Sequence, residues 1–321
     1  MDPKIESQVD QLRSGDARAL ARAISTVENR AAGWAELLKA LFPYTGKALV
    51  IGLTGAPGSG KSTLVDRLAK HYRNKEENKT VGIIAVDPTS PYTGGAILGD
   101  RIRMQDHYSD PGIFIRSMAT RGSLGGLARA TADAATVLDA SGRDLIMIET
   151  VGVGQDEIDI VRLADVTIVI LVPGMGDDVQ TIKAGIMEIA DIFVINKCDH
   201  EGAERVEREV RAMQSLATRN DCWTPPIVKT VASEGVGTEK LAEAIADYEA
   251  YLKKENLVFK KNVENWQERL IEMLRDAMLE KARAQMEMDG GSLERYAAEI
   301  AEHKRDPYSL VEEIVRGAER N

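Results

Sequence analysis

The chain has 321 residues, of which 44% are hydrophobic and 29% are charged, and its formal net charge is −10 at pH 7. This size allows one large α/β domain with helical additions, or two domains, and the acidic balance argues against a general nucleic-acid binder, which would carry a basic face. Two cysteines, Cys198 and Cys222, are too few for a disulfide framework and indicate a reducing compartment. Because the first residues lack the build of a signal or transit peptide and no apolar stretch approaches membrane-spanning length, we expect a soluble cytoplasmic protein.

Helical spacing dominates the first part of the chain. Apolar residues recur three and four positions apart between Ile5 and Phe42, and Asp16 is placed to cap a helix at its start. Pro43 ends this pattern. Residues 1–45 are therefore predicted to form an N-terminal helical extension.

Seven short apolar segments follow, separated by helical stretches. Strands that alternate with helices imply βαβ units and a parallel sheet that is buried on both faces. We therefore predict an α/β domain over residues 46–254. The expected strands are residues 47–53, 80–86, 112–118, 144–149, 166–172, 191–196 and 225–231.

Strands disappear after the seventh apolar segment. Val263, Trp266 and Leu270 then repeat at helical spacing, and Asp306 followed by a proline marks the start of a last helix. The apolar residues are typical of packing faces, against the core or a second subunit, rather than of a ligand box. Residues 255–321 are predicted to form a helical arm.

A phosphate-binding loop follows the first expected strand. The sequence "GAPGSGKST" matches G-x-x-x-x-G-K-[ST] and stands between an expected strand and an expected helix, the context that this motif requires. Its glycines let backbone N–H groups surround the phosphates, Lys61 can reach the β- and γ-phosphates, and the Ser62 hydroxyl can ligand Mg²⁺. We expect nucleotide contacts from Gly55, Ala56, Pro57, Gly58, Ser59, Gly60, Lys61, Ser62 and Thr63.

The fourth expected strand ends in an acid and runs into glycines, in "DLIMIETVGVGQDEID". A Mg²⁺ ion held by Ser62 needs a facing carboxylate, and Glu149 at the strand tip can supply it directly or through water. The backbone N–H of Gly152 can contact the γ-phosphate, and a loop held in this way relaxes once that phosphate leaves. The segment "ETVGVGQ" is therefore a candidate switch.

Guanine recognition is predicted where the sixth expected strand ends. The sequence "NKCD" matches N-K-x-D, in which the Asp accepts hydrogen bonds from guanine N1–H and the 2-amino group, and adenine presents neither donor there. The segment "TVASEG" after the seventh strand offers a backbone N–H near Ala232 for guanine O6. The expected base-binding residues are Asn196, Lys197, Asp199, Ala232, Ser233 and Glu234.

Two further acids are candidates for the metal site. Asp87 ends the second expected strand, and Asp100 lies in "GGAILGDRIRM". Either acid can join the Mg²⁺ shell or position the attacking water, and the alternative is a strand-end acid and a helix-cap acid. Arg101 and Arg103 fit phosphate clamps and surface charges equally well. The expected catalytic set is Lys61, Asp87, Asp100 and Glu149, and the expected metal ligands are Ser62 and the same three acids.

Longer segments of the chain resemble the MeaB/MMAA-type GTPases, also called ArgK-like. The resemblance rests on "GAPGSGKST", "DPTSPYTGGAILGDRIRM", "SMATRGSLGGLA", "ETVGVGQDEID", "VPGMGDDVQTIKAGIMEIAD" and "NKCD", which cover nearly all of residues 50–199. These proteins are SIMIBI-class G proteins that act as chaperones of adenosylcobalamin-dependent methylmalonyl-CoA mutase. The resemblance implies an α/β P-loop NTPase fold, a mostly parallel sheet sandwiched by helices, with N- and C-terminal helical extensions.

The resemblance also implies ligands and partners. It implies GTP or GDP with Mg²⁺ and a homodimer in which residues 255–321 are the dimerisation arm. The expected partners are the mutase and a cobalamin adenosyltransferase. Neither nucleic acid nor a membrane is expected as a partner, because of the acidic charge balance and the lack of a long apolar stretch. It places Asp87, Asp100 and Glu149 in the Mg²⁺ and switch network, and it makes "GMGDDVQTIKAGI" an additional switch that relays the nucleotide state to the mutase. The relay residues are then Asp178, Gln180 and Lys183.

Other functions stay open. A kinase of a transport-system protein fits the ArgK-like label, a scaffold would bind GTP without turnover, and a nickel-insertion GTPase would carry clustered Cys or His. Here the two cysteines and four histidines stand singly, which favours structural or surface roles for them. The hypothesis carried forward is a Mg²⁺-dependent GTPase that gates adenosylcobalamin loading and protects or reactivates an acyl-CoA mutase.

Overall fold

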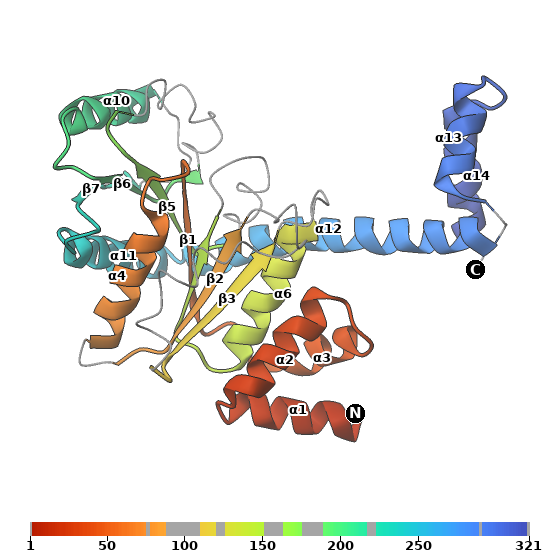
Figure 1. Cartoon of the computed structure of the whole chain (residues 1–321), viewed down its shortest axis with the longest axis horizontal. Helices are drawn as coiled ribbons and strands as arrows, with labels where there is room; N and C mark the ends of the chain where they lie inside the picture. Colours follow the sequence, from red (N-terminus) through yellow and green to blue (C-terminus); the bar gives the residue numbers. More distant parts are fainter. Residues whose placement is uncertain are drawn as a thin grey trace. The chain divides into compact units, whose positions relative to one another are not determined.

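The computed structural model of the chain contains two compact units, Met1–Glu255 and Asn256–Asn321 (Figure 1). The first unit includes both the N-terminal helices and the strands. The division of the chain into the three parts predicted from the sequence stays a prediction. The described residues are 2–74, 78–87, 110–119, 126–150, 163–174, 189–216, 223–288 and 291–319.

A parallel sheet is the centre of the first unit. Within the described residues it has seven strands in the order β3-β2-β4-β1-β5-β6-β7, and each pair of neighbours runs parallel. Every residue of β4, β5 and β6 is buried, because the continuous apolar runs are covered on both faces. The predicted strands are therefore confirmed. Their bounds are β1 Leu49–Gly55, β2 Val81–Asp87, β3 Ile113–Ala119, β4 Leu145–Glu149, β5 Val166–Leu171, β6 Ile192–Asn196 and β7 Ile227–Thr230.

Helices cover the two faces of the sheet. On one face, α4 (Lys61–Asn74) packs on β1, β2 and β4, and α11 (Thr238–Lys254) packs on β5, β6 and β7. On the other face, α6 (Gly126–Ala140) lies over β2, β3 and β4, and α10 (Ala203–Leu216) lies against β6. Figure 1 shows α4 and α6 on opposite sides of the strands.

The N-terminal helices pack on the outer side of α6. Asp16 caps α2 by accepting from the backbone N–H groups of Arg18 and Ala19 at 2.7 and 2.9 Å, and these hydrogen bonds lower the pKa of its carboxyl group. The predicted cap is therefore confirmed. Arg116 of β3 forms an ion pair with Glu28 at the end of α2, which fixes this layer against the sheet. The elements are α1 Pro3–Arg13, α2 Ala17–Glu28, α3 Trp34–Leu41 and the 3₁₀ turn η1 Phe42–Tyr44.

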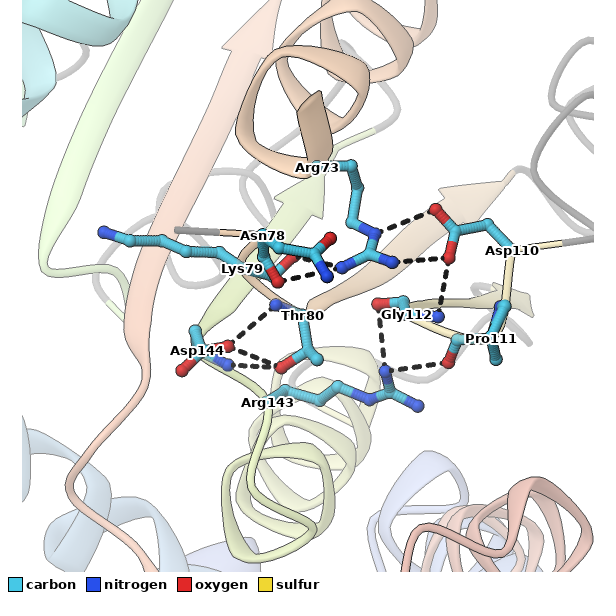
Figure 2. A network of polar contacts seen from close by, with 9 residues as sticks. All are labelled: Arg73, Asn78, Lys79, Thr80, Asp110, Pro111, Gly112, Arg143 and Asp144. Carbon is cyan, nitrogen blue, oxygen red and sulfur yellow. Dashed lines mark hydrogen bonds and ion pairs between the residues drawn. The ribbon is translucent and has the colours of Figure 1, made fainter. Parts of the chain in front are cut away.

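A polar network holds the amino-terminal edge of the sheet (Figure 2). Arg73, near the end of α4, donates through Nε and Nη2 to the two carboxylate oxygens of Asp110 at 2.8 and 2.7 Å, and this bonding raises the pKa of Arg73. Asp144, just before β4, accepts from the backbone N–H and the hydroxyl of Thr80, both at 2.7 Å. Arg143 donates to the carbonyl oxygen of Gly112 at 2.9 Å. The starts of β2, β3 and β4 are thereby fixed relative to α4.

The second unit is helical. It contains α12 (Leu257–Met288), α13 (Leu293–Ala301) and α14 (Pro307–Glu319), and α12 packs against α14. Asp306 accepts from the backbone N–H of Ser309 at 2.9 Å, which confirms the predicted start of the last helix. Among the described residues, no helix has both the length and the apolar character that crossing a bilayer requires.

Candidate nucleotide-binding site

The phosphate loop joins β1 to α4 in the middle of the sheet. β1 lies between β4 and β5, where the strand order changes direction, and open parallel sheets bind ligands at the carboxyl end of that point. Gly58 and Gly60 have φ values of 77° and 91°, which favour glycine. A Cβ atom at Gly60 would lie 2.3 Å from Asn196 Nδ2. Glycine at this position therefore allows the loop to approach the end of β6.

Lys61 begins α4, and its side chain turns back across the loop. Its ammonium group donates to the carbonyl oxygens of Gly55 at 2.8 Å and Ala56 at 3.1 Å, and the residue is only 6% exposed. A buried ammonium group needs such oxygen partners. The amino end of α4 adds the partial positive charge of its backbone N–H groups. The loop therefore presents positive charge where nucleotide phosphates are expected.

Ser62 and Glu149 meet behind the loop. The pairing of β1 with β4 sets Leu53 opposite Glu149, so the acid lies beside the start of the phosphate loop. The Ser62 hydroxyl donates to Glu149 Oε1 at 2.6 Å, and the two residues are 8% and 4% exposed. A hydroxyl and a carboxylate are hard oxygen ligands of the kind that Mg²⁺ takes. The residues present fit this metal, and its binding here stays a prediction.

The other predicted metal and switch residues are described only in part. Asp87 is the last residue of β2, which pairs with β4 through Ala85 opposite Glu149. Asp87 therefore lies at the same edge of the sheet as Glu149, but its side chain is outside the described part. The roles of Asp87 and Glu149 in metal binding stay predictions. Also outside the described residues are Asp100, Gly152, Asp178, Gln180 and Lys183.

Asn196 connects the phosphate loop to the predicted base-binding loop. Its Nδ2 donates to the carbonyl oxygen of Ser59 at 2.7 Å, and its Oδ1 accepts from the Thr230 hydroxyl and from the backbone N–H of Ala232, both at 3.0 Å. Asn196 is 2% exposed, so its amide is satisfied by protein on both sides. An aspartate here would lose the Nδ2 donor, which explains the need for asparagine.

Lys197 and Asp199 follow Asn196 around a sharp turn. Lys197 has a φ of 55°, and its ammonium group donates to the carbonyl oxygen of Gly58 at 2.9 Å. The Asp199 side chain is 52% exposed, with His200 Nε2 at 3.7 Å from its carboxylate. The carboxylate is thus accessible to a base, as its predicted role requires.

In the loop after β7, the backbone N–H of Ala232 bonds to protein, whereas a contact with guanine was expected in this loop. The Ala232 N–H, predicted to meet guanine O6, donates in this structure to Asn196 Oδ1. The guanine contact stays a prediction, and it would share or replace this bond. Arg67 of α4 binds the same loop through the carbonyl oxygens of Ala232 and Ser233. Sequence reasoning missed Arg67 because no motif spacing joins it to a residue 165 positions away.

Comparisons with known proteins agree on one family. The family described as "Methylmalonyl Co-A mutase-associated GTPase MeaB" matches residues 20–287. A Pyrococcus abyssi protein that is provisionally named a GTPase is 47% identical over 315 residues, which cover 97% of this chain and 96% of the relative. The GTPase ArgK of Escherichia coli K12 is 38% identical over 256 residues, 77% of each chain. The crystal structure of a LAO/AO transport system kinase matches with a TM-score of 0.71 and 26% identity over 98% of both chains.

These matches include the parts of the chain from which the site is built. The family match contains the phosphate loop, the end of β4, the "NKCD" turn and the loop after β7. The parallel order of the sheet and the fold match over nearly the whole chain agree with a P-loop G domain of the SIMIBI class. The chain belongs to the MeaB family of methylmalonyl-CoA mutase-associated GTPases and is a GTP-hydrolysing enzyme.

Proposed function

We propose that this GTPase is Mg²⁺-dependent and acts as a chaperone of an adenosylcobalamin-dependent acyl-CoA mutase of the methylmalonyl-CoA mutase type. Its GTP cycle gates the loading of adenosylcobalamin and the removal of damaged cofactor. The description of its family, which names that mutase, supports the partner. The observation that carries the switch part of the proposal is the buried contact between Ser62 and Glu149.

The position of Glu149 in the chain gives this contact its importance. Glu149 is the last residue of β4, and the glycine-containing segment "TVGVGQDEID" begins directly after it. If Glu149 is a metal ligand, the metal site is joined directly through the chain to a segment that can respond to the γ-phosphate. When bound, Mg²⁺ supplies charge stabilisation for phosphoryl transfer. Around it, Lys61 binds the β- and γ-phosphates, and Asp87 and Asp100 complete the acids of the network.

Base selection is the second part of the proposal. The exposed carboxylate of Asp199 accepts hydrogen bonds from guanine N1–H and the 2-amino group, while Asn196 and Lys197 hold its turn against the phosphate loop. Adenine lacks these donors in that arrangement. The loop with Ala232 and Ser233 then closes over the oxygen-bearing edge of the base.

The C-terminal unit is proposed to be a homodimerisation arm. Along α12 the apolar side chains of Leu270, Leu274 and Met278 are 51%, 61% and 64% exposed, and their four-residue spacing places them on one side of the helix. An exposed apolar stripe of this kind is typical of a surface that another chain covers. A second copy of α12 offers the same stripe, as a two-fold interface requires.

The chaperone role is tested with the purified GTPase and a candidate mutase. The rate of phosphate release is measured with and without apo-mutase, and adenosylcobalamin transfer to the mutase is followed by absorbance in the presence of a GTP analogue or GDP. We expect the mutase to raise the hydrolysis rate and cofactor transfer to depend on the nucleotide, because a switch acts only through unequal affinity of its two states. Equal transfer in both nucleotide states, with an unchanged hydrolysis rate, would contradict the chaperone role.

A pull-down from the native host, with a GTP analogue or with GDP, tests for the mutase and for a cobalamin adenosyltransferase.

The name of one solved relative favours a second candidate function. That relative is called a LAO/AO transport system kinase, so this chain is also a candidate kinase of a transport protein. Such a kinase passes the γ-phosphoryl group to a protein side chain, whereas a GTPase passes it to water. Incubation with γ-labelled GTP and a host extract distinguishes the two, because only the kinase leaves label on protein.

A further inference from the structure

Arg67 makes a two-point contact with the loop that follows β7. It lies on α4, the helix whose first residues hold the predicted phosphate and metal ligands. Its Nε donates to the carbonyl oxygen of Ala232 at 3.0 Å, and its Nη2 donates to the carbonyl oxygen of Ser233 at 2.5 Å. The planar guanidinium therefore spans two consecutive peptide groups. A lysine ammonium cannot reproduce this fork, because it is a single point of charge on a flexible stem.

The loop itself is a short, closed turn. The backbone N–H of Val231 donates to the carbonyl oxygen of Val236 at 3.1 Å, and the backbone N–H of Glu234 donates to the carbonyl oxygen of Val231 at 3.0 Å. Gly235 and Gly237 have φ values of 76° and 80°, which permit the tight path. These hydrogen bonds close the turn on itself, so the contact of Arg67 with Ala232 and Ser233 restrains the backbone of the turn.

Two polar side chains hold the backbone of one residue in this turn, Ala232, from opposite sides. Asn196 accepts from the N–H of Ala232, and Arg67 donates to the carbonyl oxygen of Ala232. Asn196 also donates to Ser59, which lies in the phosphate loop just before α4. The hydrogen bonds therefore form a closed ring through α4, the base loop, the end of β6 and the phosphate loop.

We propose that Arg67 is a positioning residue for guanine selectivity. It acts by holding the backbone of Ala232 and Ser233 in a fixed position against α4, beside the proposed base site. The inference rests on the proposed guanine site around Asp199. Arg67 touches no part of the nucleotide in this scheme. In this proposal Arg67 acts through the loop, because the backbone N–H groups can donate to the guanine oxygen only while the turn is held against α4.

Arg73 provides an internal comparison on the same helix. It also donates to two consecutive carbonyl oxygens, those of Asn78 at 2.9 Å and Lys79 at 3.2 Å, and it binds Asp110 (Figure 2). It lies at the amino-terminal edge of the sheet, whereas the phosphate loop follows the carboxyl end of β1. Both of these carbonyl contacts come from Nη1, so a change of Arg73 removes a guanidinium that binds two consecutive carbonyl oxygens without altering the base loop. This makes Arg73→Lys a matched control.

The test measures the affinities of GDP, IDP and ADP for the full chain with Arg67→Lys and Arg67→Gln. The three ligands share their phosphates and differ in the base. We expect GDP to bind about tenfold more weakly, because the nucleotide must then order a loop that Arg67 no longer holds in place. ADP affinity is expected to stay unchanged, so that the GDP-to-ADP preference falls by the same factor. IDP, which keeps the guanine oxygen and lacks the 2-amino group, is expected to weaken in parallel with GDP.

Two controls separate this inference from the site on which it rests. Asp199→Asn must lose GDP and gain XDP binding; if it does not, the guanine site is wrongly assigned. If it does, and Arg67→Lys keeps the wild-type GDP-to-ADP preference, only the role of Arg67 is overturned. Arg73→Lys should lower the thermal midpoint and leave the preference unchanged. Equal losses for GDP and ADP, or failure of both Arg67 variants to fold, would make Arg67 a residue of the fold rather than of selectivity.

Discussion

Replacement of Glu149 by glutamine separates the charge of this side chain from its shape. The Ser62 hydroxyl donates to Glu149 Oε1 at 2.6 Å, and glutamine keeps an oxygen that can accept the same hydrogen bond. Without metal, we therefore expect the Glu149→Gln variant to have a thermal midpoint close to that of the wild type. With Mg²⁺ the two side chains differ, because only the carboxylate brings a negative charge to the ion.

The size of the effect follows from the burial of this pair. Ser62 and Glu149 are 8% and 4% exposed, so water screens their interaction with a bound ion only weakly. A hydrogen bond to a charged group contributes about 1.5–3 kcal/mol, and a carboxylate that reaches Mg²⁺ through water is such an acceptor. Loss of the charge should therefore raise the Mg²⁺ concentration for half-maximal GTP hydrolysis by about ten- to a hundredfold.

The assay is a Mg²⁺ titration of phosphate release at saturating GTP. Asp144→Asn is the matched control, since Asp144 precedes the same strand at its other end and binds Thr80 instead (Figure 2). That variant loses the same charge and should keep the wild-type Mg²⁺ dependence. A wild-type titration curve for Glu149→Gln would refute the reasoning and leave Glu149 as a structural partner of Ser62.

Three further outcomes are expected from single substitutions. Asp199→Asn should lose about 2–3 kcal/mol of GTP binding and gain xanthosine-nucleotide binding, because its amide reverses one hydrogen bond to the base; competition binding measures both. Asp178→Ala and Lys183→Ala should keep near-normal intrinsic hydrolysis and lose mutase-stimulated hydrolysis in phosphate-release assays, provided that the complex still forms. Leu274→Glu in the exposed stripe of α12 should convert a dimer into a monomer by light scattering, whereas Arg283→Glu on the opposite side of that helix should not.

The sheet could be predicted from the sequence because each strand carries its own signal. The segment from Leu145 to Glu149 is apolar up to its acid, and a parallel strand buried on both faces needs such a run. Strand ends then predict the site, since the carboxyl ends of parallel strands meet at one edge. That is how Ser62 and Glu149, which are 87 residues apart, could be paired before their 2.6 Å contact was known.

Contacts between loops and helices carried no comparable signal. The pairing of Arg67 with Ala232 depends on how far α4 lies from the loop after β7, a distance set by the packing of α4 against α11. The partner atoms are backbone carbonyl oxygens, which every residue type has, so the sequence cannot mark them. The hydrogen bond from the Ala232 N–H to Asn196 was missed for the same reason. The motif predicted a guanine contact for this loop but gave no sign of a bond to Asn196.

Asn196 bonds to both loops of the proposed nucleotide site. Its single amide donates to Ser59 in the phosphate loop and accepts from Ala232 in the base loop, and it is too buried for water to replace either partner. A movement of the phosphate loop must therefore move the amide or break one of these bonds. In the proposed site, phosphates that fix the phosphate loop would therefore help to fix the base loop, and a guanine bound at Asp199 would help to fix the phosphate loop. When the phosphates are bound, part of the entropy cost of ordering the base loop has already been met, and the converse holds for a bound guanine. Ligands that contain both guanine and phosphates are therefore favoured.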